Sequence, residues 1–327
     1  MRLSSRMRSG SGSQRREIIA SYSKDWALTI LLASAFFALN IVSGHKREFS
    51  VDDPSLRYTF AVQERVPNWA LYFIAFVSPL VLSWTINYFT VRYWWDAHSS
   101  ALGTILSLGI TGAITQFVKL TVGRPRPDIL DRCNIPSDAT DPPHKLSNAS
   151  ICNQSNWHLF EDGFRSFPSG HSSLSFAGLG FLTFYLMGKL HLFDQRGHAP
   201  KAWLALAPLS AAALVAISRT MDNRHHWQDV LVGSTLGLLV SYFCYRQYYP
   251  SLASVDSHRP FAPRTEDTQE PPLLPTHGYA PAPTYYIDEE ASEDGEGATA
   301  ARPARVDNPW RQGQQQSGDE VLVSPRR

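Results

Sequence analysis

Long apolar runs separated by short polar connections occupy the first three quarters of the chain. Six of these runs are expected to form helices, at about 25–43, 68–91, 97–118, 171–188, 202–218 and 229–246. Several extend for sixteen to twenty-six residues without Asp, Glu, Lys or Arg, and about 20 apolar residues cross a bilayer as a helix. The pattern favours an all-α, polytopic membrane protein with a six-transmembrane-helix bundle over a large soluble protein with buried helices.

The two ends of the chain differ in composition from these runs. Residues 1–24 carry Arg and Lys among Ser and Gly, which predicts a basic, disordered cytosolic arm rather than a cleavable signal peptide. Half of the 22 prolines and a cluster of acids lie from residue 250 onward, so we expect 250–327 to be a disordered, Pro- and acid-rich cytosolic tail. The transmembrane domain is then 25–249. In the tail, Ser292 and the Pro-Tyr elements near Tyr285 are candidate sites for a kinase or an adaptor, with a plain solvated tail as the alternative.

The distribution of positive charge predicts an orientation. Basic residues gather in the N-terminal arm and in the connections that contain Arg92 and Lys189, and such residues are enriched on the cytosolic side of membrane proteins. The connections 44–67, 119–170 and 219–228 are therefore expected on the luminal or extracellular side, with both termini in the cytosol. The net charge of +1 gives no sign of a nucleic-acid partner.

Two features of the connection 119–170 fit a luminal position. Glycosylation sequons begin at Asn148 and at Asn153, where a luminal glycosyltransferase would reach them. Cys133 and Cys152 lie in the same connection, and an oxidising compartment allows such a pair to form a disulfide. The sequence leaves open whether they pair. Cys244 lies alone in the last apolar run and is expected to be a packing residue.

The tetrad Pro168-Ser169-Gly170-His171 directly precedes the fourth apolar run. Ser169 and Gly170 therefore lie at a predicted helix N-terminus, where free N–H groups and a partial positive charge favour phosphate. Taken alone, the tetrad is better explained by a capping Ser169 and a surface His171. The motifs on either side of it change that interpretation.

Cationic residues and a second histidine flank the tetrad in the sequence. Lys119 and Arg126 follow the third run, and Arg219 follows the fifth. Charges this close to hydrocarbon are costly unless they are paired or hydrated, so the three together predict an anionic ligand, with anchoring to lipid headgroups as the alternative. His225 and Asp229 are four residues apart, and we expect them on one helical face, with the carboxylate on one ring nitrogen and the other nitrogen free to attack.

The three pieces are Lys119-x6-Arg126-Pro127, Pro168-Ser169-Gly170-His171 and Ser218-Arg219-x5-His225-x3-Asp229. Together they resemble the three-part signature of the type-2 phosphatidic acid phosphatase superfamily. The stretches Gly123-Arg124-Pro125-Arg126-Pro127-Asp128 and His225-His226-Trp227-Gln228-Asp229 are similar to the branch that includes the fungal diacylglycerol pyrophosphate phosphatase. The resemblance spans residues 25–250, and it implies a vacuolar or other endomembrane location.

The resemblance also implies a mechanism. Neutral His225, held by Asp229, would attack phosphorus and form a phosphohistidine, while His171 would protonate the leaving oxygen and then activate water. Cations and helix N–H groups would stabilise the charge on the equatorial oxygens, at Lys119, Arg126, Arg219, Ser169 and Gly170. The chain has no metal-binding motif, so we expect no cofactor and no magnesium requirement. His226 is expected to be a neighbour rather than a ligand, and Arg124 either contacts a second phosphate or has an interfacial role.

The substrates implied by the resemblance are diacylglycerol pyrophosphate and phosphatidate in the bilayer, with lysophosphatidate as a further one. The same motifs serve sphingoid-base phosphate phosphatases and lipid head-group transferases, and the sequence does not separate these activities. A catalytically silent lipid-binding protein would be expected to lack His225, His171 or Asp229. A transporter would be expected to place polar residues at mid-membrane on several helices.

Overall fold

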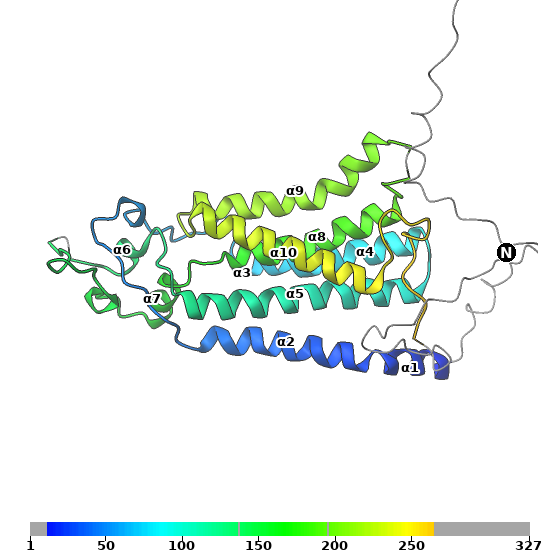
Figure 1. Cartoon of the computed structure of the whole chain (residues 1–327), viewed down its shortest axis with the longest axis horizontal. Helices are drawn as coiled ribbons and strands as arrows, with labels where there is room; N and C mark the ends of the chain where they lie inside the picture. Colours follow the sequence, from blue (N-terminus) through cyan, green and yellow to red (C-terminus); the bar gives the residue numbers. More distant parts are fainter. Residues whose placement is uncertain (1–11, 137, 195, 265–327) are drawn as a thin grey trace, which may run out of the picture. The chain divides into compact units, whose positions relative to one another are not determined.

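The computed structural model describes residues 12–136, 138–194 and 196–264. Within these ranges the fold is all-helical, apart from one isolated antiparallel bridge between Phe49 and Ser147. The long helices are α2 (Ser23–Ile41), α4 (Ser78–Phe89), α5 (Trp94–Val122), α8 (Gly170–Lys189), α9 (Ala199–Met221) and α10 (Trp227–Tyr248) (Figure 1). The shorter elements are α1 (Gly12–Ser21), η2 (Pro54–Leu56), α3 (Asn68–Tyr72), the π-helical turn η3 (Phe73–Val77), α6 (Ile129–Arg132), η4 (Ala149–Ile151) and α7 (Trp157–Gly163).

Each of the six predicted apolar runs is helical in the structure. The second run is continuous from α3 through η3 to α4. Among the described residues, four helical stretches are long and apolar enough to cross a membrane: Ser23–Ile41, Asn68–Phe89, Trp94–Val122 and Ala199–Met221. Helices α8 and α10 have 20 and 22 residues, but small and polar residues dilute their apolar character. The sequence prediction of an all-α membrane protein is therefore confirmed, with four candidate spans.

The outer faces of the long helices carry large apolar side chains. Trp203 and Leu214 on α9 are 76% and 69% exposed, and Phe89 at the end of α4 is 71% exposed. A soluble protein rarely exposes an apolar surface of this extent, because contact of such side chains with water is unfavourable. The exposed apolar faces are therefore those expected of helices that contact lipid.

Helix α8 is the central element of the bundle, because it contacts α3, η3, α4, α5, α9 and α10. Glycines allow its neighbours to approach closely. A Cβ added to Gly178 would lie 1.8 Å from the Ala75 carbonyl oxygen of η3, and one added to Gly237 of α10 would lie 2.2 Å from the Ser173 carbonyl oxygen. Close backbone contact through small residues is a general means of packing helices in membranes. Because neighbouring helices surround α8, this helix does not need an apolar surface that faces lipid.

The connection 42–67 packs against the connection 123–169, which contains α6 and α7, at one end of the bundle (Figure 1). The His45 N–H donates to the Leu120 carbonyl at 2.8 Å, and Phe49 exchanges backbone hydrogen bonds with Ser147. Gly123 ends α5 in a left-handed conformation with a φ of 57°, and any Cβ there would lie 2.0 Å from the His45 carbonyl oxygen. Only glycine therefore fits where the chain leaves α5 for this end.

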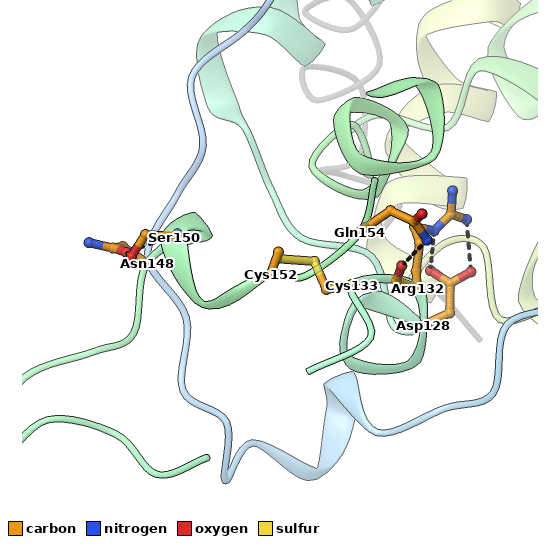
Figure 2. The surroundings of a disulfide bond; sticks show 7 residues. All are labelled: Asp128, Arg132, Cys133, Asn148, Ser150, Cys152 and Gln154. Carbon is orange, nitrogen blue, oxygen red and sulfur yellow. Dashed lines mark hydrogen bonds and ion pairs between the residues drawn. A yellow bond between two sulfur atoms is a disulfide. The ribbon is translucent and has the colours of Figure 1, made fainter. Parts of the chain in front are cut away.

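Cys133 and Cys152 form a disulfide within this region, with Cα atoms 4.7 Å apart (Figure 2). The bond joins the end of α6 to the residue after η4. Beside it, the Gln154 side chain donates to the Arg132 carbonyl at 2.9 Å, and Arg132 forms an ion pair with Asp128 at 2.8 Å. The pairing that the sequence left open is therefore present in the structure.

The opposite end of the bundle departs from the prediction for the two termini. Residues 12–24, which were expected in a disordered arm, form α1 and the start of α2. Residues 250–264, which were expected in the tail, pack on the bundle: Trp95 Nε1 donates to the Phe261 carbonyl at 2.9 Å, and Lys189 Nζ donates to the His258 carbonyl at 2.6 Å. The packed part of the chain therefore extends beyond both predicted boundaries. Ser292 and Tyr285 lie outside the described residues.

Candidate active site

The eight predicted site residues come together where α5, α8, α9 and α10 meet the connections 42–67 and 123–169. They come from α5 (Lys119), the connection after it (Arg126), the start of α8 (Ser169, Gly170 and His171), α9 (Arg219), the loop before α10 (His225) and α10 itself (Asp229). A Cβ on Gly170 would lie 3.2 Å from Lys119 Nζ. The Ser169 N–H donates to the Asp229 carbonyl at 3.0 Å. The three motifs therefore build one site.

His225 is buried in the loop between α9 and α10. Its Nδ1 lies 2.7 Å from the carbonyl oxygen of Ser166. Because a carbonyl only accepts, Nδ1 carries the proton and Nε2 keeps its lone pair. Burial, with the charges of Arg126 and Lys119, lowers the pKa of His225 well below its ordinary value. His225 is therefore a neutral imidazole at neutral pH, with the nitrogen that can act as a nucleophile left free.

Asp229 does not hold His225 in the way that the spacing predicted. His225 precedes α10, and its Nδ1 is 4.0 Å from the Asp229 carboxylate, so the hydrogen bond goes to the Ser166 carbonyl instead. The reason is local: His226 is the N-cap of α10, and Asp229 at the third helical position accepts the His226 N–H at 3.1 Å in a capping box. Asp229 also accepts from Ser166 Oγ at 2.5 Å and from Arg124 Nη1 at 2.6 Å.

The Asp229 carboxylate is thus a buried anchor for the segments that position His225. It joins three segments: the α5–α6 connection through Arg124, the segment before Pro168 through Ser166, and the N-terminus of α10 through His226. Ser166 contributes twice, since its carbonyl accepts from His225 and its hydroxyl donates to Asp229. Arg124 is engaged in an ion pair with this carboxylate. Whether Arg124 also contacts a second phosphate or has an interfacial role stays a prediction.

His171 lies in the first turn of α8 and faces the connection 42–67. Its Nε2 is 3.0 Å from the Val66 carbonyl oxygen, so Nε2 carries a proton in this arrangement. The Glu64 carboxylate is 3.9 Å from the same nitrogen. As the first two residues of α8, Gly170 and His171 have backbone N–H groups without an intrahelical acceptor. The Ser169 N–H is not available for a ligand, because it donates to the backbone carbonyl of Asp229.

Carboxylates from the connections hold two of the three predicted phosphate-binding cations. Arg126 donates through Nε to the Asp162 carbonyl at 2.8 Å and pairs through Nη2 with its carboxylate at 2.6 Å. Arg219 pairs through Nη1 with Glu64 at 2.8 Å. Lys119 has no ion pair within 4 Å among the described residues. Burial opposes ionisation of Asp162, but the surrounding arginines, led by Arg126, hold its pKa well below its ordinary value.

Two further arginines belong to this cluster although neither is a specified position of the motifs. Arg224 pairs with Glu64 at 2.9 Å and lies 3.7 Å from Asp162. Arg132 pairs with Asp162 at 2.8 Å. Arg224 directly precedes His225, which is a weak signal in the sequence. Glu64 lies far from every motif along the chain, and Asp162 lies six residues before the tetrad but belongs to no motif. Only the folded connections bring them to the cations.

The predicted glycosylation sequons of the connection 119–170 are on the surface. Asn148 and Asn153 are exposed, and the Asn148 side chain accepts from the Ser150 N–H at 3.0 Å (Figure 2). Within residues 12–136, 138–194 and 196–264, no group of three or more His, Cys, Asp and Glu side chains is placed to hold a metal ion.

The bundle thus has apolar outer faces and holds His171 and His225 among cationic side chains at one end. Residues 100–252 match the model of the PAP2 superfamily. The chain is 41% identical to lipid phosphate phosphatase 2 of Arabidopsis thaliana over 73% of its own length and 81% of that protein. The chain belongs to the PAP2 superfamily.

Two other relatives agree with this assignment. Lipid phosphate phosphatase 1 of Arabidopsis thaliana is 37% identical over 75% of the chain and 73% of that protein. Diacylglycerol pyrophosphate phosphatase 1 of Saccharomyces cerevisiae is 35% identical over 75% of the chain and 84% of that protein. The resemblance noted from the motifs is confirmed. No solved structure matches the chain significantly.

Proposed function

We propose that the protein hydrolyses phosphate groups of glycerolipids, converting diacylglycerol pyrophosphate to phosphatidate and phosphatidate to diacylglycerol. The observation that carries the proposal is the His225 imidazole, whose Nδ1–H is bound to the Ser166 carbonyl beside Lys119 and Arg126. A neutral nucleophile beside buried cations suits an anionic phosphate, and the apolar helix faces suit a substrate whose acyl chains stay in the bilayer. The names of the relatives support the substrate class.

In the proposed reaction, His225 Nε2 attacks phosphorus as the bond to the leaving oxygen breaks, and His171 gives that oxygen its proton. Water then attacks the phosphohistidine, and its proton passes to His171. Arg126, Arg219 and Lys119 stabilise the equatorial oxygens, together with the free N–H groups at the start of α8. These cations supply the charge stabilisation, so the reaction is proposed to need no magnesium.

The test is phosphate release by the purified protein in detergent micelles. Diacylglycerol pyrophosphate, phosphatidate and sphingosine phosphate are compared with and without EDTA, using His225→Ala and the exposed His158→Ala as a matched control. We expect release that resists EDTA, is abolished in His225→Ala and is retained in His158→Ala. Activity of His225→Ala near that of the wild type would refute the nucleophile. A preference for sphingosine phosphate would replace the substrate class, and release only with an added alcohol would indicate a transferase.

We further propose that α2, α3–α4, α5, α8, α9 and α10 all cross the membrane, with the active site on the luminal side and both termini in the cytosol, in a vacuolar or other endomembrane. The exposed positions of Asn148 and Asn153 support a luminal face. Digestion with an endoglycosidase, compared between the wild type and the Asn148→Gln, Asn153→Gln double variant, tests the orientation. A shift in the wild type alone is expected. Accessibility of these sites to a cytosolic labelling reagent would contradict it.

A further inference from the structure

The segment 61–66 lies over the ends of α8 and α9 and is fixed there by polar contacts. The Arg65 N–H donates to the Asp222 carboxylate at 2.9 Å, and the Arg65 side chain forms an ion pair with the same group. Arg224 Nη2 donates to the Ala61 carbonyl at 3.1 Å. These contacts bring the side chain between them, Glu64, to the cations of the active site.

Glu64 bridges Arg219, which is a predicted phosphate-binding residue, and Arg224, for which the sequence predicted no role. Its Oε2 is 2.8 Å from Arg219 Nη1, and its Oε1 is 2.9 Å from Arg224 Nη2. The same carboxylate lies 3.9 Å from His171 Nε2. The Arg219 and Arg224 side chains are buried, whereas the Glu64 side chain keeps 23% of its surface exposed. Glu64 is therefore the partner that can move toward solvent.

Arg224 Nη2 has close partners in Glu64 and the Ala61 carbonyl, but the other nitrogens of its guanidinium are less well placed. Its Nε is buried and has no hydrogen-bond partner in the part of the chain that the structure describes. Its guanidinium stacks on Phe60 at 4.6 Å, and the Asp162 carboxylate is 3.7 Å from Nη1, beyond hydrogen-bonding distance. A buried donor without an acceptor is unfavourable. Arg224 also directly precedes His225, so its backbone is fixed beside the nucleophile.

We propose that Arg224 is a fourth phosphate-binding cation, and that Glu64 is an internal carboxylate which the substrate phosphate displaces from Arg219 and Arg224. The inference rests on the proposed function, because it concerns the same site. A carboxylate presents two oxygens to a guanidinium much as phosphate does. A phosphomonoester carries a charge of about −1.5 to −2 near neutral pH and three acceptor oxygens, so it is the stronger ligand for the pair.

The consequence is a defined effect on affinity. A site whose cations are held by Glu64 binds any phosphate with an affinity reduced by the fraction of time that the cations are free. If Glu64 holds them for about nine-tenths of the time, the reduction is about tenfold, and it is equal for inorganic phosphate and for phosphatidate. Glu64 would thereby limit occupation of the site by substrate and by product phosphate alike.

The experiment compares Glu64→Gln with Arg224→Gln in the purified full-length protein. The exposed ion pair Arg57 and Asp52, in the same connection, supplies matched controls as Arg57→Gln and Asp52→Asn. The Kd for inorganic phosphate is measured by calorimetry, and the KM for phosphatidate by phosphate release. We expect Glu64→Gln to lower both values by about the same factor, near tenfold, and Arg224→Gln to raise both by about tenfold. The two controls are expected to leave both values unchanged.

The opposite signs separate the proposal from a simple structural ion pair. If Glu64 only stabilised the loop, its removal would weaken phosphate binding as the removal of Arg224 does, and that result would overturn the proposal. An unchanged Kd in Glu64→Gln would overturn it too. Should Glu64→Gln not fold, Glu64→Asp keeps the charge at a shorter reach and is expected to lower Kd by a smaller factor. The phosphate measurement needs no lipid turnover, so it tests Glu64 even if the wild type hydrolyses none of the lipids.

Discussion

The substitution Asp229→Asn removes a buried negative charge near the proposed nucleophile and keeps the size of the side chain. The carboxylate is fully buried, accepts from Arg124 and Ser166, and lies 4.0 Å from His225 Nδ1. It makes no hydrogen bond to His225, so its effect on the reaction is expected through charge and through Ser166. The two routes can be separated, because Ser166→Ala removes only the second.

The size of the charge effect follows from the geometry. When His225 Nε2 bonds to phosphorus with Nδ1 still protonated, the ring becomes positively charged. A carboxylate 4.0 Å away stabilises that charge by about 4 kcal/mol at an effective dielectric constant of about 20. A loss of this size lowers the rate about 10³-fold. We therefore expect kcat of Asp229→Asn to be about three orders of magnitude below that of the wild type.

Ser166→Ala is expected to cost much less. It removes the hydroxyl that donates to Asp229, while the backbone carbonyl that accepts from His225 remains. A hydrogen bond to a charged group contributes about 1.5–3 kcal/mol to stability, and most of that loss is expected in folding rather than in the reaction. We expect kcat to fall by about tenfold or less.

The assay is single-turnover phosphate release from phosphatidate, with each variant checked for its elution profile and melting temperature. An Asp229→Asn rate within about tenfold of the wild type would refute the electrostatic reasoning. So would a Ser166→Ala rate as low as that of Asp229→Asn, because the hydroxyl contact rather than the charge would then control the nucleophile.

Three further predictions concern the fold and the acid limb of activity. Cys133→Ser removes the disulfide to Cys152, which joins residues 19 apart. We expect the free energy of unfolding to fall by about 3 kcal/mol, measured as a lower denaturation midpoint. A reducing agent is expected to lower the midpoint of the wild type in the same way. Gly178→Leu places a Cβ 1.8 Å from the Ala75 carbonyl oxygen, so little monodisperse protein is expected in size-exclusion chromatography. Because the pKa of His225 is lowered, its reactive neutral form persists as pH falls through 6.5, and we expect the acid limb of kcat/KM below that pH; a limb above 6.5 would contradict it.

The positions of the helices were predictable because hydrocarbon-length apolar runs leave few alternatives. The ends were less predictable, since a helix end depends on capping and on tertiary contacts. Residues 250–264 read as tail by composition, yet backbone carbonyls at His258 and Phe261 accept from Lys189 and Trp95 of the bundle. The acceptors in these contacts are backbone carbonyls, which every residue has, so a pattern of side chains does not predict them.

The candidate site was predictable where its residues lie at helix ends. Lys119 near the end of α5 and His171 at the start of α8 are placed by the helices themselves, so motif spacing along the chain translates into proximity. The predicted contact between His225 and Asp229 was wrong in detail. Two residues that are four positions apart lie on one helical face only if both belong to the helix, and α10 begins at Trp227. Ser166 was missed because its backbone carbonyl, which any residue has, makes the contact.

The acids of the site show what the loops add to the helices. A cluster of buried arginines next to hydrocarbon would repel itself and be poorly solvated, so it needs anions before a substrate arrives. Glu64 and Asp162 are two of these anions, and both lie in connections at the end of the bundle rather than in the long helices, while Asp222 at the end of α9 also pairs with Arg219 at 3.2 Å. A carboxylate that keeps exposed surface, as Glu64 does, can give way to phosphate. The contacts that hold the cations in place in the free protein then also leave them available to a stronger anion.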